Sequence, residues 1–270
     1  MTFTVVFFHA HPDDEALLTG GTMARLADEG HRVVLVVATA GEEGLTSPDF
    51  TSGSALGDVR RKELDEAARA LGCSKVEVLG FPDSGMEGPV PPGSFCAVPP
   101  EVPAQRLSAI LAEEAANVLV SYDPAGGYGH RDHVQVHRTG RIAARAAGTP
   151  VLLEATVDRR LLRAALTAAS PFRPRSPDFD PARFGDLFAD PATITHSVRV
   201  RAQAHRKRAA LRAHASQASG DSADRTIAWM LGLPLPVFRL ALGREWFCEV
   251  GRKPGRRRLD DPLSSIRRGS

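Results

Sequence analysis

Phe7-Phe8-His9-Ala10-His11-Pro12-Asp13-Asp14-Glu15 is the most informative stretch of this chain. An apolar run from Thr4 to His9 enters it and a segment with helical spacing of apolar residues leaves it, which predicts a strand, a turn and a helix. Ligands bind at the carboxyl ends of strands in parallel α/β sheets, because side chains there leave the buried sheet. His11, Asp13 and Asp14 lie on this turn, where His-x-x-Asp is half of a metal site that needs a third ligand from elsewhere.

Strands and helices alternate along the rest of the chain, which predicts an α/β fold. We expect a Rossmann-like, mostly parallel sheet with helices on both faces, and no dinucleotide site, because the first turn lacks the glycine-rich fingerprint. Predicted strands are 3–8, 32–39, 75–79, 117–122, 151–157, 194–200 and 245–250, and predicted helices are 15–30, 58–71, 101–116, 133–147, 159–169, 201–218 and 224–231. Residues 1–251 are expected to form one domain, with a flap or insertion at 170–191.

Composition narrows the class of protein. The last 19 residues, 252–270, hold seven Lys/Arg and two Asp, a net +5, whereas the whole chain carries +2 and residues 1–251 therefore about −3. This basic, apolar-poor tail is predicted to be disordered, and a basic face for nucleic acid is not supported. No apolar run is long enough to span a membrane and no secretory signal is visible. Three widely spaced cysteines indicate a reducing cytoplasm, and homo-oligomer formation is left open.

A second histidine-rich turn follows another predicted strand. It reads Ser121-Tyr122-Asp123-Pro124-Ala125-Gly126-Gly127-Tyr128-Gly129-His130-Arg131-Asp132-His133 and leads into a helix. If both turns meet at one sheet edge, His11, Asp14 and His133 converge on one cation. Two imidazoles and a carboxylate suit Zn²⁺ with positions open for water and substrate, although the same set binds Fe²⁺ in oxygenases. Helix capping by Asp14 is the structural alternative.

The groups around these three side chains favour hydrolysis. Asp13, next to Asp14, is placed to act as a general base on water. His130, as a charged donor, and Tyr128, as a neutral one, are placed to stabilise an oxyanion, and Asp132 to tune a nearby imidazole. Two rivals stay open at this point: a non-haem Fe(II) oxygenase with the same ligands, and a non-catalytic carbohydrate-binding protein.

The two motifs together resemble the LmbE-like (PIG-L) zinc-dependent de-N-acetylases. The resemblance extends over nearly the whole chain to about residue 250, through blocks such as Ala40-Gly41-Glu42, Gly80-Phe81-Pro82-Asp83-Ser84-Gly85 and His214-Ala215-Ser216-Gln217. It implies an LmbE-like fold and the removal of an N-acyl group, most often acetyl, from a small amino-sugar conjugate.

By the same resemblance, His11, Asp14 and His133 match the zinc ligands and Asp13 the general base. His130 matches the transition-state stabiliser, Asp132 the residue that tunes it, and Tyr128 the mobile loop tyrosine, while Arg60 and Asp83 resemble positions that grip the sugar. The chain departs from the pattern at Arg131, where many relatives have proline. Arg131 adjoins the ligand motif, which leaves the identity of the accepted substrate open.

Overall fold

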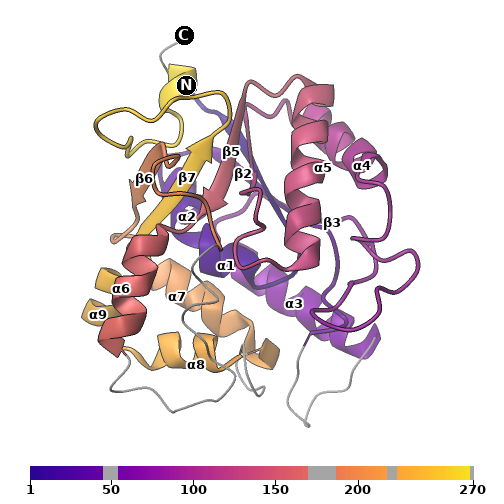
Figure 1. The fold of residues 1–270 in the computed structure, drawn as a ribbon, viewed down its shortest axis with the longest axis horizontal. Coiled ribbons are helices and arrows are strands. Elements are labelled where there is room, and N and C mark those ends of the chain that lie inside the picture. The colour runs from indigo at the N-terminus through magenta and orange to yellow at the C-terminus, as the bar shows by residue number, and fades with distance from the viewer. Residues whose placement is uncertain (45–53, 170–186, 218–223, 268–270) are drawn as a thin grey trace.

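The computed structural model describes residues 1–44, 54–169, 187–217 and 224–267, and one seven-stranded sheet runs through these ranges (Figure 1). Its strand order is β3-β2-β1-β4-β5-β7-β6. The strands are β1 (Thr4–His9), β2 (Arg32–Val37), β3 (Lys75–Val78), β4 (Val118–Tyr122), β5 (Val151–Thr156), β6 (His196–Arg199) and β7 (Arg244–Glu249). The helices are α1 (Asp14–Leu18), α2 (Gly20–Asp28), α3 (Ser54–Leu71), α4 (Glu101–Glu113), α5 (Arg131–Ala147), α6 (Arg159–Ala169), α7 (Ala204–Ala213), α8 (Asp224–Gly232), α9 (Leu235–Ala241) and α10 (Ser264–Arg267), with a short 3-10 turn at Ala215–Gln217.

The first five strands pair in parallel, and β7 runs against them between β5 and β6. β1 pairs in parallel with β2 and β4, so that Phe7 lies opposite Leu35 on one side and Val120 on the other. β7 runs antiparallel to both β5 and β6. The predicted Rossmann-like, mostly parallel sheet is therefore confirmed, with an antiparallel edge that the sequence did not reveal.

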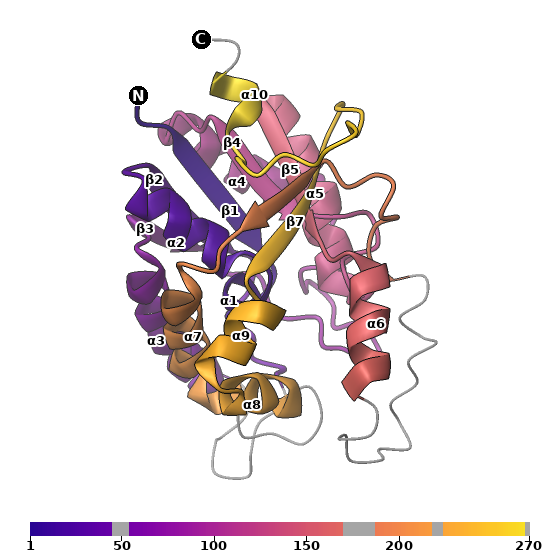
Figure 2. The ribbon, with the colours of Figure 1, turned by 90° about the vertical axis from the view of Figure 1, so that its left-hand side faces the viewer.

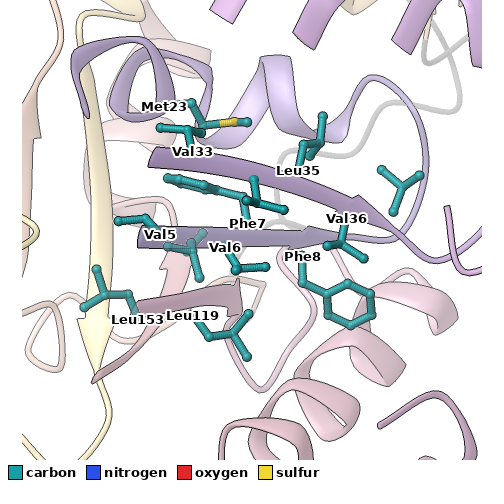
Figure 3. Close-up of a cluster of buried hydrophobic side chains, with 14 of the residues drawn as sticks. Val5, Val6, Phe7, Phe8, Met23, Val33, Leu35, Val36, Leu119 and Leu153 are labelled. Atoms are coloured by element: carbon teal, nitrogen blue, oxygen red, sulfur yellow. The ribbon is translucent and has the colours of Figure 1, made fainter. Parts of the chain in front are cut away.

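The core forms around β1 because both faces of that strand are covered. Val5, Val6, Phe7 and Phe8 each expose 1% or less of their surface, and Figure 3 shows them among side chains of β2, β4 and α2. Full burial of one such side chain contributes about 1.5–3 kcal/mol. Helices α2, α3 and α7 contact one another on one side of the sheet, and α4 and α5 pack together on the other (Figure 2).

The predicted helix over 15–30 is two helices, because the chain breaks at Thr19. Gly21, just beyond the break, lies so close to β7 and its neighbours that a Cβ there would come within 2.4 Å of Val200. The buried carboxylate of Glu245 accepts hydrogen bonds from the backbone N–H groups of Gly21 and Thr22, at 2.9 and 2.7 Å. The break thus creates a new helix start that the last strand caps.

The basic segment from residue 252 differs from the predicted disordered tail as far as residue 267. Leu259 donates its N–H to Thr195 O at 3.0 Å and accepts the N–H of Ser197 at 2.8 Å, which adds a bridge beside β6. Leu263 is fully buried, and Asp260 pairs with Arg199 at 2.9 Å. A few well-spaced apolar residues suffice to anchor an otherwise charged segment, which is why composition misled here.

The structure bears on three further expectations: the segment 170–191, membrane-spanning helices and the cysteines. Most of the flap or insertion predicted at 170–191 lies outside the described residues, which resume at Leu187. Among the described helices none combines the length and the apolar character that a membrane crossing requires. Cys73, Cys96 and Cys248 are free thiols.

Candidate metal and catalytic site

His11 and Asp14 are brought together by the turn between β1 and α1. The strand ends at His9 and the helix begins at Asp14, so His11 lies at the carboxyl edge of the sheet. The backbone N–H of His11 donates to Asp14 Oδ2 at 3.0 Å, and His11 Nδ1 lies 3.4 Å from the same oxygen. Both side chains are almost completely buried.

His133 reaches the same place from the first turn of α5, which follows β4. Its Nε2 lies 3.2 Å from Asp14 Oδ1, and its side chain is fully buried. Two ligands of a tetrahedral zinc ion with bonds of roughly 2.0–2.1 Å would stand about 3.3 Å apart. The spacings of 3.4 and 3.2 Å along the series His11, Asp14, His133 are therefore those of groups around a small cation.

The surroundings of His133 also fit a metal ion. Nδ1 of this buried ring has no hydrogen-bond partner among the described residues, and Nε2 lies 3.2 Å from Asp14 Oδ1 without the alignment of a hydrogen bond. Buried polar atoms are nearly always paired, so an orphaned imidazole points to a missing ligand.

The distances between possible metal-ligating atoms add further candidate ligands to the three predicted ones. The donor atoms of His11, His130 and His133 lie within 4.8 Å of one another, and so do those of His11, Asp83 and Asp132. Asp14 belongs to neither of these groups, although it contacts His11 and His133 directly. We give Asp14 precedence, because its two oxygens bridge two imidazoles and a zinc site of His and carboxylate ligands is typical.

Asp13 is held in an uncommon backbone conformation, with φ of 106°. Its N–H donates to Glu15 Oε2 at 2.9 Å, and its Oδ2 accepts from Arg60 Nη2 at 3.3 Å. Burial raises the pKa of Asp13 to about 6, with Arg60 opposing the rise and the neighbouring Asp14 adding to it. A carboxyl with this pKa is mostly ionised at pH 7 yet binds a proton readily, as a general base requires.

Arg60 lies beneath this turn rather than at an open rim. Its Nη1 donates to Gly41 O at 2.7 Å and its Nη2 to Pro12 O at 2.5 Å, and the residue is 3% exposed. Gly41 has φ of 74°, and a Cβ there would come within 2.3 Å of the Arg60 guanidinium. The guanidinium thus binds two backbone carbonyl groups and the Asp13 carboxylate. Its expected contact with a sugar stays a prediction.

The environment of His130 favours its neutral form, whereas the sequence led us to expect a charged donor. Burial, together with the nearby His11 and His133, lowers the pKa of His130 to about 4. Its Nδ1 accepts the backbone N–H of Asp132 at 3.1 Å and so caps α5. Because Nδ1 accepts, the ring proton is on Nε2, where it can be donated to another group.

The carboxylate of Asp132 faces His11 instead of His130. Its Oδ2 lies 3.2 Å from His11 Nε2 and accepts the backbone N–H of Ser84 at 3.0 Å. The hydrogen bond from Asp132 to the His130 ring comes from the backbone N–H, and the charge of Asp132 raises the pKa of His130 against the stronger lowering by burial, so the tuning role that the resemblance implied stays a prediction. The loop after β3, where Asp83 was expected to bind substrate, therefore also contacts Asp132 through Ser84, which the sequence did not predict.

Asp83 and Tyr128 also contact this cluster. Asp83 Oδ1 is 3.4 Å from His11 Nε2, and although burial alone would raise the pKa of Asp83, the facing His11 holds it well below its usual range. The Tyr128 ring lies 4.8 Å from the His133 ring, centre to centre, and 40% of the residue is exposed. Asp83 thus joins the charged cluster, and Tyr128 covers it at the solvent side.

Two buried contacts support the site and were not singled out as functional from the sequence. Glu15 Oε1 lies 2.7 Å from His214 Nε2, and both residues are fully buried. Tyr122 donates or accepts a hydrogen bond with His9 Nδ1 at 2.7 Å and stacks against His133. The block His214-Ala215-Ser216-Gln217 was the available signal for the first contact, because it recurs in the family pattern.

Comparisons with known proteins agree with this geometry. The family model described as PIG-L, GlcNAc-PI de-N-acetylase, matches residues 6–144, which include both histidine motifs. A 1D-myo-inositol 2-acetamido-2-deoxy-alpha-D-glucopyranoside deacetylase of Streptomyces griseus is 38% identical over 256 residues, covering 86% of this chain and 80% of the relative.

Two solved structures show how widely this fold is used. An N,N'-diacetylchitobiose deacetylase of Pyrococcus horikoshii matches with a TM-score of 0.56 and 25% identity, over 92% of this chain and 83% of the other. A 4-carboxy-2-hydroxymuconate hydratase of Pseudomonas putida KT2440 has a TM-score of 0.56 and 16% identity, over 95% and 99%, and shows the fold alone. The chain belongs to the PIG-L family and is an enzyme of its N-deacetylase class.

Proposed function

We propose that this enzyme removes the acetyl group from N-acetylglucosamine joined to an inositol, with a zinc ion bound by His11, Asp14 and His133. The observation that carries the proposal is the contact of Asp14 with both His11 and His133, at 3.4 and 3.2 Å, in the turn that also holds Asp13. The substrate class is supported by the relative from Streptomyces griseus, whose name gives a deacetylase of an inositol-linked acetamido glucopyranoside.

The reaction needs one group to remove a proton and others to hold developing negative charge. When bound, zinc supplies a Lewis acid that polarises the amide carbonyl and brings the pKa of a bound water to about 7. Asp13 accepts the proton of the attacking water as its oxygen bonds to the carbonyl carbon. His130 donates its Nε2 proton as a hydrogen bond to the resulting oxyanion, and Tyr128 donates its hydroxyl from the solvent side.

Collapse of this intermediate breaks the carbon–nitrogen bond. The proton held by Asp13 passes to the leaving nitrogen, so that a free amine and acetate form and Asp13 is ionised again. Arg60 restrains the Asp13 carboxylate, since its Nη2 lies 3.3 Å from Asp13 Oδ2 and its other bonds fix the guanidinium. Asp83, at the edge of the cluster, is placed to accept hydrogen bonds from sugar hydroxyls.

An Fe(II) oxygenase with the same three ligands is the alternative, and Fe²⁺ is the alternative ion for the hydrolase. Asp13 argues against the oxygenase, because such an enzyme has no need of a second carboxylate beside its ligand. The fold itself does not decide, since a hydratase shares it. The cytoplasmic location, the single domain at 1–251 and a homo-oligomeric state remain predictions.

The test measures acetate release from N-acetylglucosaminyl-inositol and from a panel of other N-acetylated glucosamine conjugates. We expect turnover of the inositol conjugate, loss of it after chelation, and recovery with Zn²⁺ under argon. Asp13→Asn should reduce kcat by about 10²–10⁴ while the bound zinc stays stoichiometric. Full activity of Asp13→Asn, or turnover that requires oxygen and 2-oxoglutarate, would refute the proposal.

A further inference from the structure

Asp123 is a fully buried carboxylate that accepts four hydrogen bonds, although it contacts none of the groups assigned to the reaction. It follows β4 directly and begins the loop that ends at His130. Its Oδ1 accepts the backbone N–H groups of Ala125 and Gly127, each at 3.0 Å. Its Oδ2 accepts the hydroxyl of Thr156 at 2.5 Å and the backbone N–H of Ala189 at 3.0 Å.

These bonds join three separate parts of the chain. Thr156 is the last residue of β5, and its Oγ1 also accepts the Ala189 N–H at 3.0 Å. Phe188 donates its N–H to Gly127 O at 2.8 Å, so that Gly127 is bonded through its carbonyl to Phe188 and through its N–H to Asp123. The loop after β4 is thus fixed to the end of β5 and to the segment Leu187–Ala189 through one carboxylate.

The Tyr128 loop needs such support because its backbone is unusual. Gly126, Gly127 and Gly129 all have positive φ, at 64°, 65° and 90°. Glycine is free to leave these conformations, so contacts must select them. A Cβ on Gly127 would lie 3.3 Å from the Phe188 ring, and one on Gly129 would lie 3.3 Å from Leu187, so these two side chains cover the loop closely.

We propose that Asp123 is a positioning residue that, together with Leu187–Ala189, holds Tyr128 over the reacting groups. It acts through Tyr128, whose ring rests 4.8 Å from that of His133. The inference rests on the proposed function, since it assumes that the Tyr128 hydroxyl contributes to the deacetylation. It goes further by assigning a catalytic consequence to a residue that touches neither substrate nor metal.

The chemistry requires a carboxylate at this position. All four partners of Asp123 approach as donors, and an ionised carboxylate offers only acceptor positions. An asparagine of the same shape would turn one oxygen into an NH₂ group facing two of these donors, either Thr156 and Ala189 or the two loop amides. The loop then loses its fixed geometry, while the size of the side chain is unchanged.

The test is a double-mutant cycle of Asp123→Asn and Tyr128→Phe. We expect each single variant to lower kcat about 10-fold with KM little changed, and the double variant to be no slower than Tyr128→Phe alone. Asp158→Asn is the matched control, because Asp158 is also a buried acid just after a strand but is bonded to Arg160 and Arg258. Its effect on kcat should be small and should multiply with that of Tyr128→Phe.

Hydrogen exchange of the Gly127 and Gly129 amides gives a second readout that needs no turnover. Asp123→Asn should raise their exchange rates at least 10-fold, and Thr156→Val, which removes the hydroxyl that donates to Asp123 and accepts from Ala189 but leaves the bonds of Asp123 to the loop amides, should raise them less. Independent, multiplying effects of the two substitutions on kcat, or unchanged exchange in both Asp123→Asn and Thr156→Val, would overturn the inference. Absence of acetate release by the wild type on the whole panel would instead overturn the proposed function, whatever the exchange rates show.

Discussion

Replacing Glu15 by glutamine tests how the general base is held in place. Glu15 Oε2 accepts the N–H of Asp13 at 2.9 Å, and Oε1 faces His214 Nε2 at 2.7 Å. Burial alone would raise the pKa of Glu15 and lower that of His214, but each shifts the pKa of the other in the opposite direction, which favours the charged pair. Glutamine keeps the shape of the side chain and removes the charge, so it weakens both bonds at once.

The magnitude follows from the burial of both partners. At 2.7 Å the attraction is about 6 kcal/mol for an effective dielectric constant near 20, most of which offsets desolvation. Losing a charged hydrogen-bond partner inside the protein costs about 2–3 kcal/mol, or a fall in Tm of roughly 5–10 °C. Asp13, at φ of 106°, stores about 1–3 kcal/mol of backbone strain. Once its N–H is released it can relax, and a displacement of about 1 Å lowers kcat roughly 100-fold.

Glu245→Gln is the matched control for this experiment. Glu245 is also buried, pairs with Lys207 at 2.6 Å and accepts two backbone N–H groups of α2, away from the proposed reaction site. Thermal unfolding and steady-state acetate release are measured for both variants. Both should lose stability, and only Glu15→Gln should lose kcat. A wild-type kcat in Glu15→Gln, or the same fall in kcat in both variants, would refute the reasoning.

Three further outcomes are expected. Chelation of the metal should lower the Tm measured by calorimetry, and added Zn²⁺ should restore it. His133→Ala, which removes a proposed zinc ligand, should abolish this dependence of the Tm on Zn²⁺. Leu263→Ala should cost about 2–5 kcal/mol in urea unfolding if the C-terminal segment packs as described, whereas a disordered tail would show no change. Burial, with Arg252 adding to it, lowers the pKa of His196 from 6.5 to about 4, so its contribution to stability is complete above pH 6.5 and falls as the pH drops toward 4. Between pH 7 and 4.5 the wild type should therefore lose about 2.5 kcal/mol more stability than His196→Asn, and equal losses would contradict this.

The sequence was a good guide to the parallel half of the sheet. Continuous apolar runs such as Val5–Phe8 identify buried strands, because a parallel strand between helical layers has no polar face. Strand direction at the other edge was beyond reach, since the side-chain pattern of a strand looks the same in either orientation. The segment after residue 251 misled because its charge hides Leu259 and Leu263, whose burial depends on a partner strand far away in the sequence.

The site was predicted where residue type and spacing carry the chemistry, and missed where only the fold brings partners together. His11, Asp14 and His133 come from two motifs, and the structure places them in mutual contact. The contact of Asp132 with His11 and the bond of Glu15 to His214 join residues 121 and 199 positions apart. A side chain such as Glu15, one position beyond a ligand motif, has no sequence signal of its own.

The position of β7 in the sheet has a consequence for synthesis of the chain. β7 is the last strand to leave the ribosome, yet it lies between β5 and β6. The parallel half can pair as it emerges, whereas β6 waits for a neighbour made some 45 residues later. The carboxylate that caps α2, Glu245, also arrives only with this strand. Nascent chains that stall between residues 199 and 244 would therefore expose an unpaired strand and an uncapped helix, which makes the synthesis of the segment between β6 and β7 the interval of greatest exposure to chaperones and proteases.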